Sequence, residues 1–254
     1  MADAFQSFDE STLGAFIESP LGMRTGDLPR GGVWATHRDD IYRLSSTDFT
    51  VLDEAVSTLG NVWGIGGDNS VVWGGVDSGS DEFIQQYSPV DLSPVIGNRT
   101  VDLDVAPGFG CGGNADGIFF CAFSGEGLIY NPDFSINFFS SLTTDIGATN
   151  PSGMGGGGAG LTQRILLTDT DDDTVRDIYP DRHPSSYGWY IVRQIEAPGS
   201  SGGCEGCGGD GQVCYVSNVH DDEIWVYDHR LHYVSGPHPW VGDGSPFGIG
   251  GGRL

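Results

Sequence analysis

The sequence predicts an all-β fold, a five-bladed β-propeller, and three observations lead to this fold class. First, a Gly-X-Gly-Gly segment occurs five times, and its copies start 46, 43, 53 and 42 residues apart. Second, each of the first four copies is followed by an apolar stretch, a turn, an Ile-aromatic stretch, a second turn and a last apolar stretch. Four short strands per repeat of this length are typical of a propeller blade. The copies begin at Gly64, Gly110, Gly153, Gly206 and Gly248.

The third observation is the position of the last copy, which predicts how the ring closes. Only residues 252–254 follow it, so three strands of its blade are missing at the C-terminal end. Residues 33–52 contain three strand-like stretches but no Gly-X-Gly-Gly segment. We therefore expect the C-terminal strand to pair with N-terminal strands, because this pairing leaves no open sheet edge between the first and the last blade.

Residues 1–28 lack the repeat, whereas residues 29–254 form the predicted propeller without an internal linker. Ser11 is a candidate N-cap for a short helix around residues 12–17. This N-terminal arm has two interpretations, an anchoring or assembly element and a segment packed across one propeller face. In the first, its apolar side chains are buried against a neighbouring subunit, and they are Phe5, Phe8, Leu13, Phe16 and Ile17.

The repeated glycines are expected in the innermost strands, which crowd around the propeller axis. Small residues permit this close approach. A Gly-Ile-Gly-Gly segment without a transition from strand to helix differs from a phosphate-binding loop, so nucleotide binding is not expected.

The composition is strongly acidic. The chain has 35 acidic residues against 11 basic residues, all of them Arg, and a formal net charge of −24. Such a chain repels itself in dilute buffer, whereas a Debye length of about 3 Å near 1 M salt removes most of this repulsion. We therefore expect adaptation to molar salt, with an ordinary acidic secreted protein as the alternative. A nucleic-acid partner is not expected, because the chain cannot assemble a basic face.

The start of the sequence, residues 1–5, lacks the basic region of a signal peptide, and no apolar run approaches 18 residues. We expect neither a signal peptide nor insertion into a membrane. A protein that works outside the cell would then leave by another route, such as assembly into a particle that is released by lysis.

The five cysteines form an odd set that does not resemble a disulfide framework. Cys111 and Cys207 occupy the X position of the repeat, where other copies have Ile or Met, so we expect small buried hydrophobic residues there. Two alternatives remain open. One is a zinc site that combines Cys204 and Cys207 with Cys214 and His220, and the other is a disulfide between Cys207 and Cys214.

The fourth blade contains an acidic stretch that resembles a calcium-binding loop. Asp169, Asp171, Asp173 and Asp177 stand at relative positions 1, 3, 5 and 9, an alternation that turns several carboxylates toward one hard cation. Thr174 stands where such loops have glycine. The alternative is a solvated hairpin tip. Ca²⁺ is the only cofactor that we predict.

Histidines occur near carboxylates in the fifth blade, at His220, at His229 and His232 around Asp228, and at His238. They fall in turns or alternate along a strand, and no Ser or Cys nucleophile stands out from the repeat, so we predict that the protein is not an enzyme. Aromatic residues expected in turns and loops are candidates for stacking on sugars, and these are Trp63, Tyr187, Trp189 and Trp240.

The repeat resembles a family of propellers encoded by archaea and archaeal viruses, whose units run Gly-Ile-Gly-Gly-Asp, Val-Ile-Trp, Asp-x-Ile-Tyr and Thr-Asp-Phe-Ser-Val-Ile. The matching segments here are Gly64–Asp68 with Val71–Trp73, Asp40–Tyr42 with Thr47–Val51, and Asp133–Ile136. The resemblance covers most of residues 29–254, is strong only in the first two blades, and implies a fold without catalytic residues. Together with the acidic composition, it implies a protein of a haloarchaeon or a haloarchaeal virus.

Two functional hypotheses follow. In the first, the chain is a non-enzymatic virion protein of a halophilic archaeal virus, a protruding capsid component (turret or decoration) or a tail component that attaches to the host surface. Its partners would be other virion proteins through residues 1–28, further copies of itself in the particle, and a host glycan or surface glycoprotein.

In the second hypothesis, the chain is a carbohydrate-binding or glycan-cleaving propeller of a haloarchaeal cell. A cluster of carboxylates or histidines on the axis would favour cleavage. The innermost strands offer Gly, Ile, Cys and Met instead, which favours the virion hypothesis, although a fold alone does not determine function.

Overall fold

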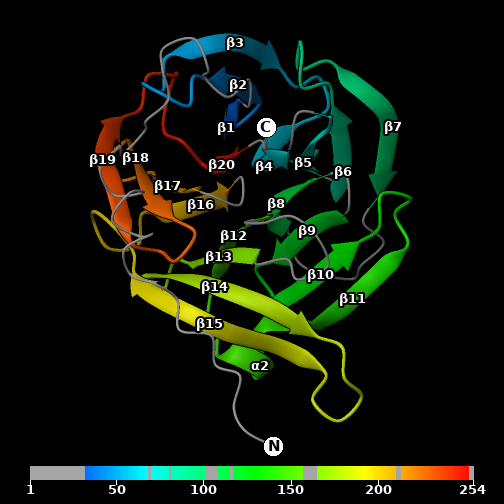
Figure 1. The fold of residues 1–254 in the computed structure, drawn as a ribbon. Coiled ribbons are helices and arrows are strands. Elements are labelled where there is room, and N and C mark those ends of the chain that lie inside the picture. The colour runs from blue at the N-terminus through cyan, green and yellow to red at the C-terminus, as the bar shows by residue number, and fades with distance from the viewer. Residues whose placement is uncertain are drawn as a thin grey trace, which may run out of the picture. The chain divides into compact units, whose positions relative to one another are not determined.

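The fold is a five-bladed β-propeller, as the repeat predicts, and each blade is an antiparallel sheet of four strands. Figure 1 shows the ring along its axis, with the innermost strands near the centre and the outermost strands on the rim. The N-terminal arm, with the predicted assembly residues Phe5, Phe8, Leu13, Phe16 and Ile17, lies outside the described residues. The computed structural model describes residues 32–67, 70–79, 82–100, 108–114, 117–156, 165–209 and 213–251.

Within each blade the strands follow one another from the axis outward. The first blade consists of β20 (Gly248–Gly251), β1 (Val33–His37), β2 (Asp40–Leu44) and β3 (Val51–Val56). The second has β4 (Asn61–Gly67), β5 (Val72–Asp77), β6 (Glu82–Tyr87) and β7 (Pro94–Thr100), and the third has β8 (Gly108–Asn114), β9 (Gly117–Ala122), β10 (Glu126–Tyr130) and β11 (Ile136–Ser141). The fourth has β12 (Pro151–Gly156), β13 (Ile165–Asp169), β14 (Thr174–Asp181) and β15 (Gly188–Glu196), and the fifth has β16 (Cys204–Gly209), β17 (Val213–Asn218), β18 (Glu223–Asp228) and β19 (Tyr233–Pro239).

The ring closes through the strand that the sequence predicts. β20 pairs antiparallel with β1, so that Ile249 lies opposite Ala35 and Gly251 lies opposite Val33. Ile249 is only 1% exposed and belongs to the core between the first and fifth blades. The C-terminal strand therefore completes the blade begun by the N-terminal strands.

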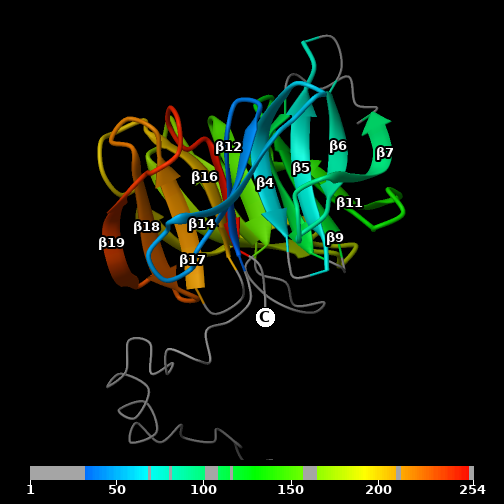
Figure 2. The same ribbon diagram turned by 90° about the horizontal axis from the view of Figure 1, so that it is seen from above.

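The repeated glycines let the innermost strands approach one another around the axis, where the strands stand side by side in Figure 2. A methyl group on Gly66 would lie 3.2 Å from the Cα of Gly112, and one on Gly208 would lie 2.8 Å from the Cα of Gly250. Side chains at these positions would push neighbouring blades apart. The residues at the X position are all buried, and they are Ile65, Cys111, Met154, Cys207 and Ile249.

A recurring turn joins neighbouring blades at the hairpin between the third and fourth strands. In four blades this hairpin carries an apolar residue with a positive φ, and these residues are Phe49, Leu92, Phe134 and Leu231. Phe49 of the first blade contacts the rings of Tyr215 and His238 in the fifth, and Phe134 of the third contacts Trp73 in the second. Each turn thus anchors its blade in the preceding one.

The fourth blade replaces this turn by residues 182–187, in which no residue has a positive φ. A short helix, α2 (Leu142–Ile146), precedes the blade. The hydroxyl of Ser141 caps it by accepting a hydrogen bond from the N–H of Thr144, and Gly147 ends it with a φ of 67°. No helix in the described ranges is long and apolar enough to cross a membrane.

Candidate functional site

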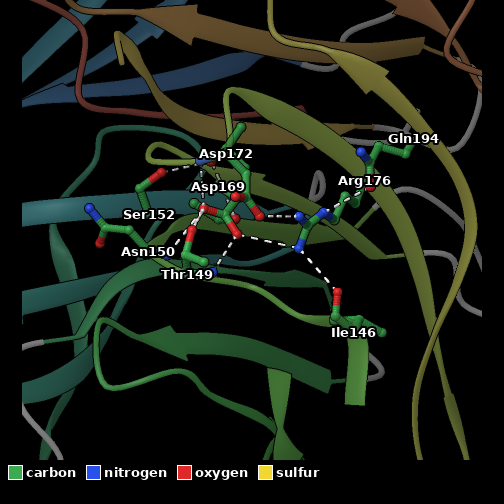
Figure 3. Close-up of polar contacts among 10 residues, drawn as sticks. Ile146, Thr149, Asn150, Ser152, Asp169, Asp172, Arg176 and Gln194 are labelled. Atoms are coloured by element: carbon green, nitrogen blue, oxygen red, sulfur yellow. Dashed lines mark hydrogen bonds and ion pairs between the residues drawn. The ribbon is translucent and has the colours of Figure 1, made fainter. Parts of the chain in front are cut away.

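The predicted calcium ligands lie around the turn between β13 and β14, where Asp169 is held within the protein (Figure 3). The Asp169 carboxylate is fully buried and accepts hydrogen bonds from the N–H of Thr149 at 2.9 Å and of Asn150 at 3.1 Å. Arg176 of β14 lies 3.3 Å from Asp169 and 2.6 Å from Asp172. The Asp169 carboxylate, which would be the first ligand of the calcium loop, therefore already binds the Arg176 guanidinium and two backbone N–H groups.

Arg176 has partners around its whole guanidinium group. Its Nε donates to the side chain of Gln194 at 3.1 Å, and its Nη1 donates to the carbonyl oxygen of Ile146 at 3.5 Å. The side chain is only 5% exposed, so these contacts and the two carboxylates compensate its loss of water. The network connects α2 and the loop that follows it to the two outer strands of the fourth blade (Figure 3).

The strand register separates the first and the last of the predicted ligands. Asp169 is opposite Thr174, and Asp177 is opposite Leu166. Side chains alternate along a strand, so Asp169 shares a face with Leu167, in the core toward the third blade. Asp177 shares the other face with Leu166, in the core toward the fifth blade. One cation cannot contact both carboxylates, because the sheet lies between them.

The two middle residues of the predicted set also have local partners. Asp171 accepts a hydrogen bond from the side chain of Asn150 at 3.1 Å, and Asp173 accepts from the hydroxyl of Ser201 and from the N–H of Gly202. In the part of the chain that the structure describes, no three His, Cys, Asp or Glu side chains are grouped so that they could hold a metal ion. The four aspartates are therefore not assembled as one ligand set.

The fifth-blade histidines lie in separate surroundings. The Nδ1 of His220 is 3.1 Å from the carbonyl oxygen of Ser201, and the Nδ1 of His232 is 3.1 Å from the carboxylate of Asp228. His238 is 2.9 Å from the hydroxyl of Ser235, its ring packs against Phe49, and its burial lowers its pKa. These contacts hold turns and blades together.

All five cysteines are free and buried, so the alternative of a Cys207–Cys214 disulfide is not what the structure shows. The register explains why, because Cys207 lies opposite Val216 whereas Cys214 lies opposite Gly209. Burial raises the pKa of the Cys207 thiol to about 12. A metal would require deprotonated thiols, which these buried surroundings disfavour.

The structure reveals a set of positions that our reading of the sequence missed. In four blades the pairing of the innermost strand shifts by one residue just before the repeat glycine, as between Val62 and Gly64. Such a bulge re-aims the extra side chain. The bulged residues with described side chains are Trp63, Ser152 and Glu205, and Phe247 precedes the glycine of the first blade at the equivalent place.

Hydroxyl groups of the second strands stabilise this irregular backbone. The N–H of Gly248 donates to the hydroxyl of Thr36 at 3.1 Å, and the N–H of Gly206 donates to that of Ser217 at 3.1 Å. The Ser217 hydroxyl also donates to the carbonyl oxygen of Phe247 in the next blade, at 3.4 Å. A hydroxyl group thus accepts from the N–H of the repeat glycine both in the bulged fifth blade and in the first blade, where the pairing is regular.

The bulged residues and Phe247, here called the axial ring, follow one another around one end of the propeller axis. A methyl group on Gly153 would lie 2.6 Å from the carbonyl oxygen of Glu205, one on Gly206 would lie 2.5 Å from that of Phe247, and one on Gly248 would lie 2.8 Å from that of Trp63. The axial-ring residues of neighbouring blades are therefore close together. The rings of Trp63 and Phe247 are in edge contact at 5.0 Å, and His37 stacks on Phe247 at 5.5 Å. Glu205 of the fifth blade follows Ser152 of the fourth blade around the axial ring. Burial raises the pKa of the Glu205 carboxyl group.

The four aromatic residues predicted in turns differ in their surroundings. Trp189 lies in β15 and is 1% exposed, and Trp240 is 9% exposed, so both are core residues rather than sugar platforms. Trp63 is a partly buried residue of β4 in the axial ring, and Tyr187 is 49% exposed on the outer hairpin of the fourth blade.

A sequence signal for the axial ring does exist. The residue before each repeat glycine changes from Trp to Phe, Ser, Glu and Phe along the chain, while the glycine itself never changes. The X position inside the repeat also varies, but only among Ile, Cys and Met, whereas this position changes between aromatic, hydroxyl and acidic side chains. Such a change of chemical type within a repeated frame is the pattern of a binding position in a repeat protein.

Comparisons with known proteins bear on the fold alone. No protein-family model matches the sequence. No curated protein matches it either. A chain of a nidogen–laminin complex is 11% identical, with 87% of this chain and 98% of that chain covered and a TM-score of 0.52.

Two further solved structures are similar at lower scores. The glutaminyl cyclase of Myxococcus xanthus is 10% identical over 74% of this chain and 69% of that chain, with a TM-score of 0.46. The β-propeller domain of Cps50 (Swd1) from Myceliophteria thermophila is 10% identical over 80% and 67%, with a TM-score of 0.45. At such identities, what those proteins bind or catalyse says nothing about this chain.

Proposed function

We propose that this chain is a non-enzymatic structural protein of a halophilic archaeal virus, a protruding capsid (turret or decoration) or tail component that contacts the host surface. The observation that carries the proposal is the axial ring. A constant frame of glycines presents side chains that change from blade to blade, which suits recognition of a partner.

The chemistry of the axial ring fits a sugar residue of a host glycan or surface glycoprotein. Trp63 and Phe247 offer aromatic surface, and Glu205 offers a carboxyl group near them, whereas the Ser152 hydroxyl is buried and donates to the carbonyl oxygen of Cys204. Aromatic rings bind the apolar face of a sugar, while hydroxyl and carboxyl groups bind its hydroxyls. Multiple copies in a particle would add weak individual contacts through multivalency.

The composition and the sequence resemblance support the proposed role in a virus particle. A charge of −24 without Lys suits molar salt, and the repeat resembles propellers of archaea and archaeal viruses. In this proposal residues 1–28 attach the propeller to other virion proteins. A ring closed on itself has no open edge between its first and last blades, which suits an exposed protrusion.

A glycan-cleaving propeller of a haloarchaeal cell is the second candidate, and one observation favours it. The raised pKa of Glu205 is a property of a general acid, because a carboxyl group that stays protonated can donate to a leaving oxygen. Glycosidases generally pair such an acid with a second carboxylate, and Glu205 is the one carboxylate of the axial ring.

The particle proposal is tested by mass spectrometry of purified particles of a virus that encodes the chain. We expect the chain to be present, and a chain lacking residues 2–28 to fold yet fail to be incorporated. Purified particles that never contain the chain would contradict the virion role.

The axial ring is tested by adhesion of the purified protein to host cells in molar salt. Trp63→Ala and Glu205→Gln should each weaken adhesion about tenfold, which corresponds to about 1.4 kcal/mol per lost contact. Tyr233→Ala is the matched control, because this aromatic residue is 58% exposed on the rim, away from the axis. Equal adhesion of all variants would contradict the site, and glycan turnover that Glu205→Gln abolishes would establish the second candidate.

A further inference from the structure

The outer hairpin of the fourth blade departs from the repeat and is apolar on its surface. β14 and β15 are the longest strands of the described chain, with 8 and 9 residues, and Figure 1 shows their connecting loop extending from the ring. Tyr179 and Tyr190 lie opposite each other and stack at 5.6 Å, each 40% exposed. Ile191 and Val192 follow with exposures of 40% and 45%. These four residues are here called the fourth-blade surface.

This hairpin is also electrically neutral, although the chain as a whole is strongly acidic. Residues 174–196 contain three Arg and three acidic residues, a balance of zero, whereas the formal net charge of the chain is −24. Two copies of an acidic chain repel each other over most of their surfaces. They can approach most easily where charge is balanced and apolar side chains are exposed. A basic partner, by contrast, would find stronger attraction elsewhere on this protein.

The other outer strands carry features that protect a sheet edge from association. Charged side chains, prolines and β-bulges are the usual protections. The pairing of every outer strand shifts at a bulge, so charges and prolines make the difference between these strands. β3 contains Asp53 and Glu54, β7 begins with Pro94, and β19 contains Pro237 and Pro239.

The edge of β11 is protected by the fourth-blade hairpin itself. The N–H of Phe139 donates to the hydroxyl of Tyr187 at 3.3 Å, and Arg182 donates to the side chain of Asn137 at 2.5 Å. On β15 the N–H of Trp189 donates to Asp145 at 2.9 Å, which covers only the first end of that strand. From Tyr190 to Val192, β15 has neither charge nor proline, and among the described strands only β14 pairs with it.

We infer that two copies of this chain associate through the fourth-blade surface, with their β15 strands side by side. A two-fold axis makes such a contact self-complementary, because each copy presents the same Tyr, Ile and Val side chains to the other. The buried network around Arg176 and Asp169 fixes the outer strands of this blade, so little ordering is needed on association. The association requires neither a particle nor a glycan.

Sedimentation of the full-length protein in molar salt tests this inference. The wild-type chain should be a dimer at high micromolar concentration, and Val192→Glu should be a monomer, because it places two carboxylates in the contact. Leu52→Glu is the matched control. Leu52 is the bulged residue of β3 as Val192 is of β15, it is 57% exposed, and it lies on another blade.

Circular dichroism shows whether Val192→Glu folds. If it does not, Tyr190→Ala replaces it, and we expect the dimer of that variant to have a dissociation constant at least tenfold higher than that of the wild type. A wild-type monomer under these conditions would overturn the inference. So would a dimer that Leu52→Glu dissociates as readily as Val192→Glu, or one that only removal of residues 2–28 dissociates. If the fourth-blade surface binds only a different protein, the wild-type chain would be a monomer, and this result would also contradict the inferred dimer.

Discussion

Arg176 and Asp169 show how single buried charges stabilise one blade of this propeller. Their side chains are 5% and 0% exposed, and both lose hydration on folding. The attraction between them offsets that loss only because each has further hydrogen-bond partners. Asp169 accepts from the backbone of residues 149 and 150, and Arg176 donates to Gln194 and Ile146. Removing one partner would leave the other charge buried without compensation.

We predict that Arg176→Met lowers the free energy of unfolding by about 3–5 kcal/mol, the usual result of leaving one member of a buried pair alone. Arg43→Met is the control, since Arg43 lies 3.6 Å from Asp53 with side chains 28% and 35% exposed. Exposed pairs contribute about 1 kcal/mol or less. Urea unfolding in molar salt measures both variants, and equal losses would contradict the role given to the buried pair.

The calcium prediction shows what spacing alone does not reveal. The spacing of Asp169 and Asp177 fits that of ligands in a calcium loop, but the chain reverses direction between them and continues as β14. Residues on two paired strands then face one side or the other according to register, which the sequence does not state. Arg176 stands among the aspartates in the sequence and is their counterion in the structure. The first and last of the carboxylates read as ligands, Asp169 and Asp177, therefore face two different cores.

The recurring turn is the element that links blade to blade. In the first three blades its aspartate accepts hydrogen bonds from the residue two positions on, as Asp48 does from the N–H and hydroxyl of Thr50, and the intervening apolar residue enters the neighbouring blade. The resemblance in the sequence already marked Asp-Phe-Thr and Asp-Phe-Ser as repeated. Their inward direction requires a positive φ at the aromatic residue, which no sequence pattern stated.

These turns make the stability depend on pH. Hydrogen bonds from Ser45 and Thr50 lower the pKa of Asp48, and those from Ser88 and Ser93 lower the pKa of Asp91, relative to the ordinary value of 3.8. A carboxyl group with a lowered pKa in the folded state contributes stability above its ordinary pKa and loses it as the pH falls through the folded value.

We therefore predict that the melting temperature in molar salt falls as the pH decreases from about 5 to about 3. The double variant Asp48→Asn with Asp91→Asn should fall less over the same interval, because its amides do not titrate. Calorimetry at matched salt measures both proteins. A wild-type melting temperature that stays constant across the interval would show that the turns do not contribute in this way.

At the scale of the whole molecule, most of the architecture could be predicted from the repeat. Five copies of Gly-X-Gly-Gly and a final copy near the end of the chain predict the blade number and the closing strand, because both follow from counting strands. The axial ring was harder to predict, since it depends on bulges that shift Trp63 and Glu205 out of the ladder. Alternation along a strand predicts faces only where pairing is regular.

The charge of the whole molecule leads to a prediction about salt. With 35 acidic residues against 11 Arg, the fold should loosen in dilute buffer, where the Debye length is about 10 Å or more, and tighten near 1 M salt, where it is about 3 Å. Circular dichroism and melting temperature over a salt series measure this. A protein that melts identically in dilute and molar salt would not be adapted to salt.

The closing strand supports the last prediction. A chain that ends at Ser245 lacks β20, so the first blade loses its innermost strand and β1 loses the pairs from Val33 to Thr36. The core between the first and fifth blades loses Ile249, and the close contacts of Gly250 with Gly66 and Gly208 disappear from the axis. Because these losses fall on two blades at once, the whole ring should be destabilised and not only one strand.

We expect the truncated chain to be largely unfolded at room temperature in molar salt, with its exposed β1 edge promoting aggregation. A chain that ends at Gly251 is the control, since it keeps all of β20 and removes only residues 252–254. Circular dichroism and sedimentation of both chains give the answer. If the chain ending at Ser245 melts within a degree or two of the control, pairing of β20 with β1 is not what holds the ring closed.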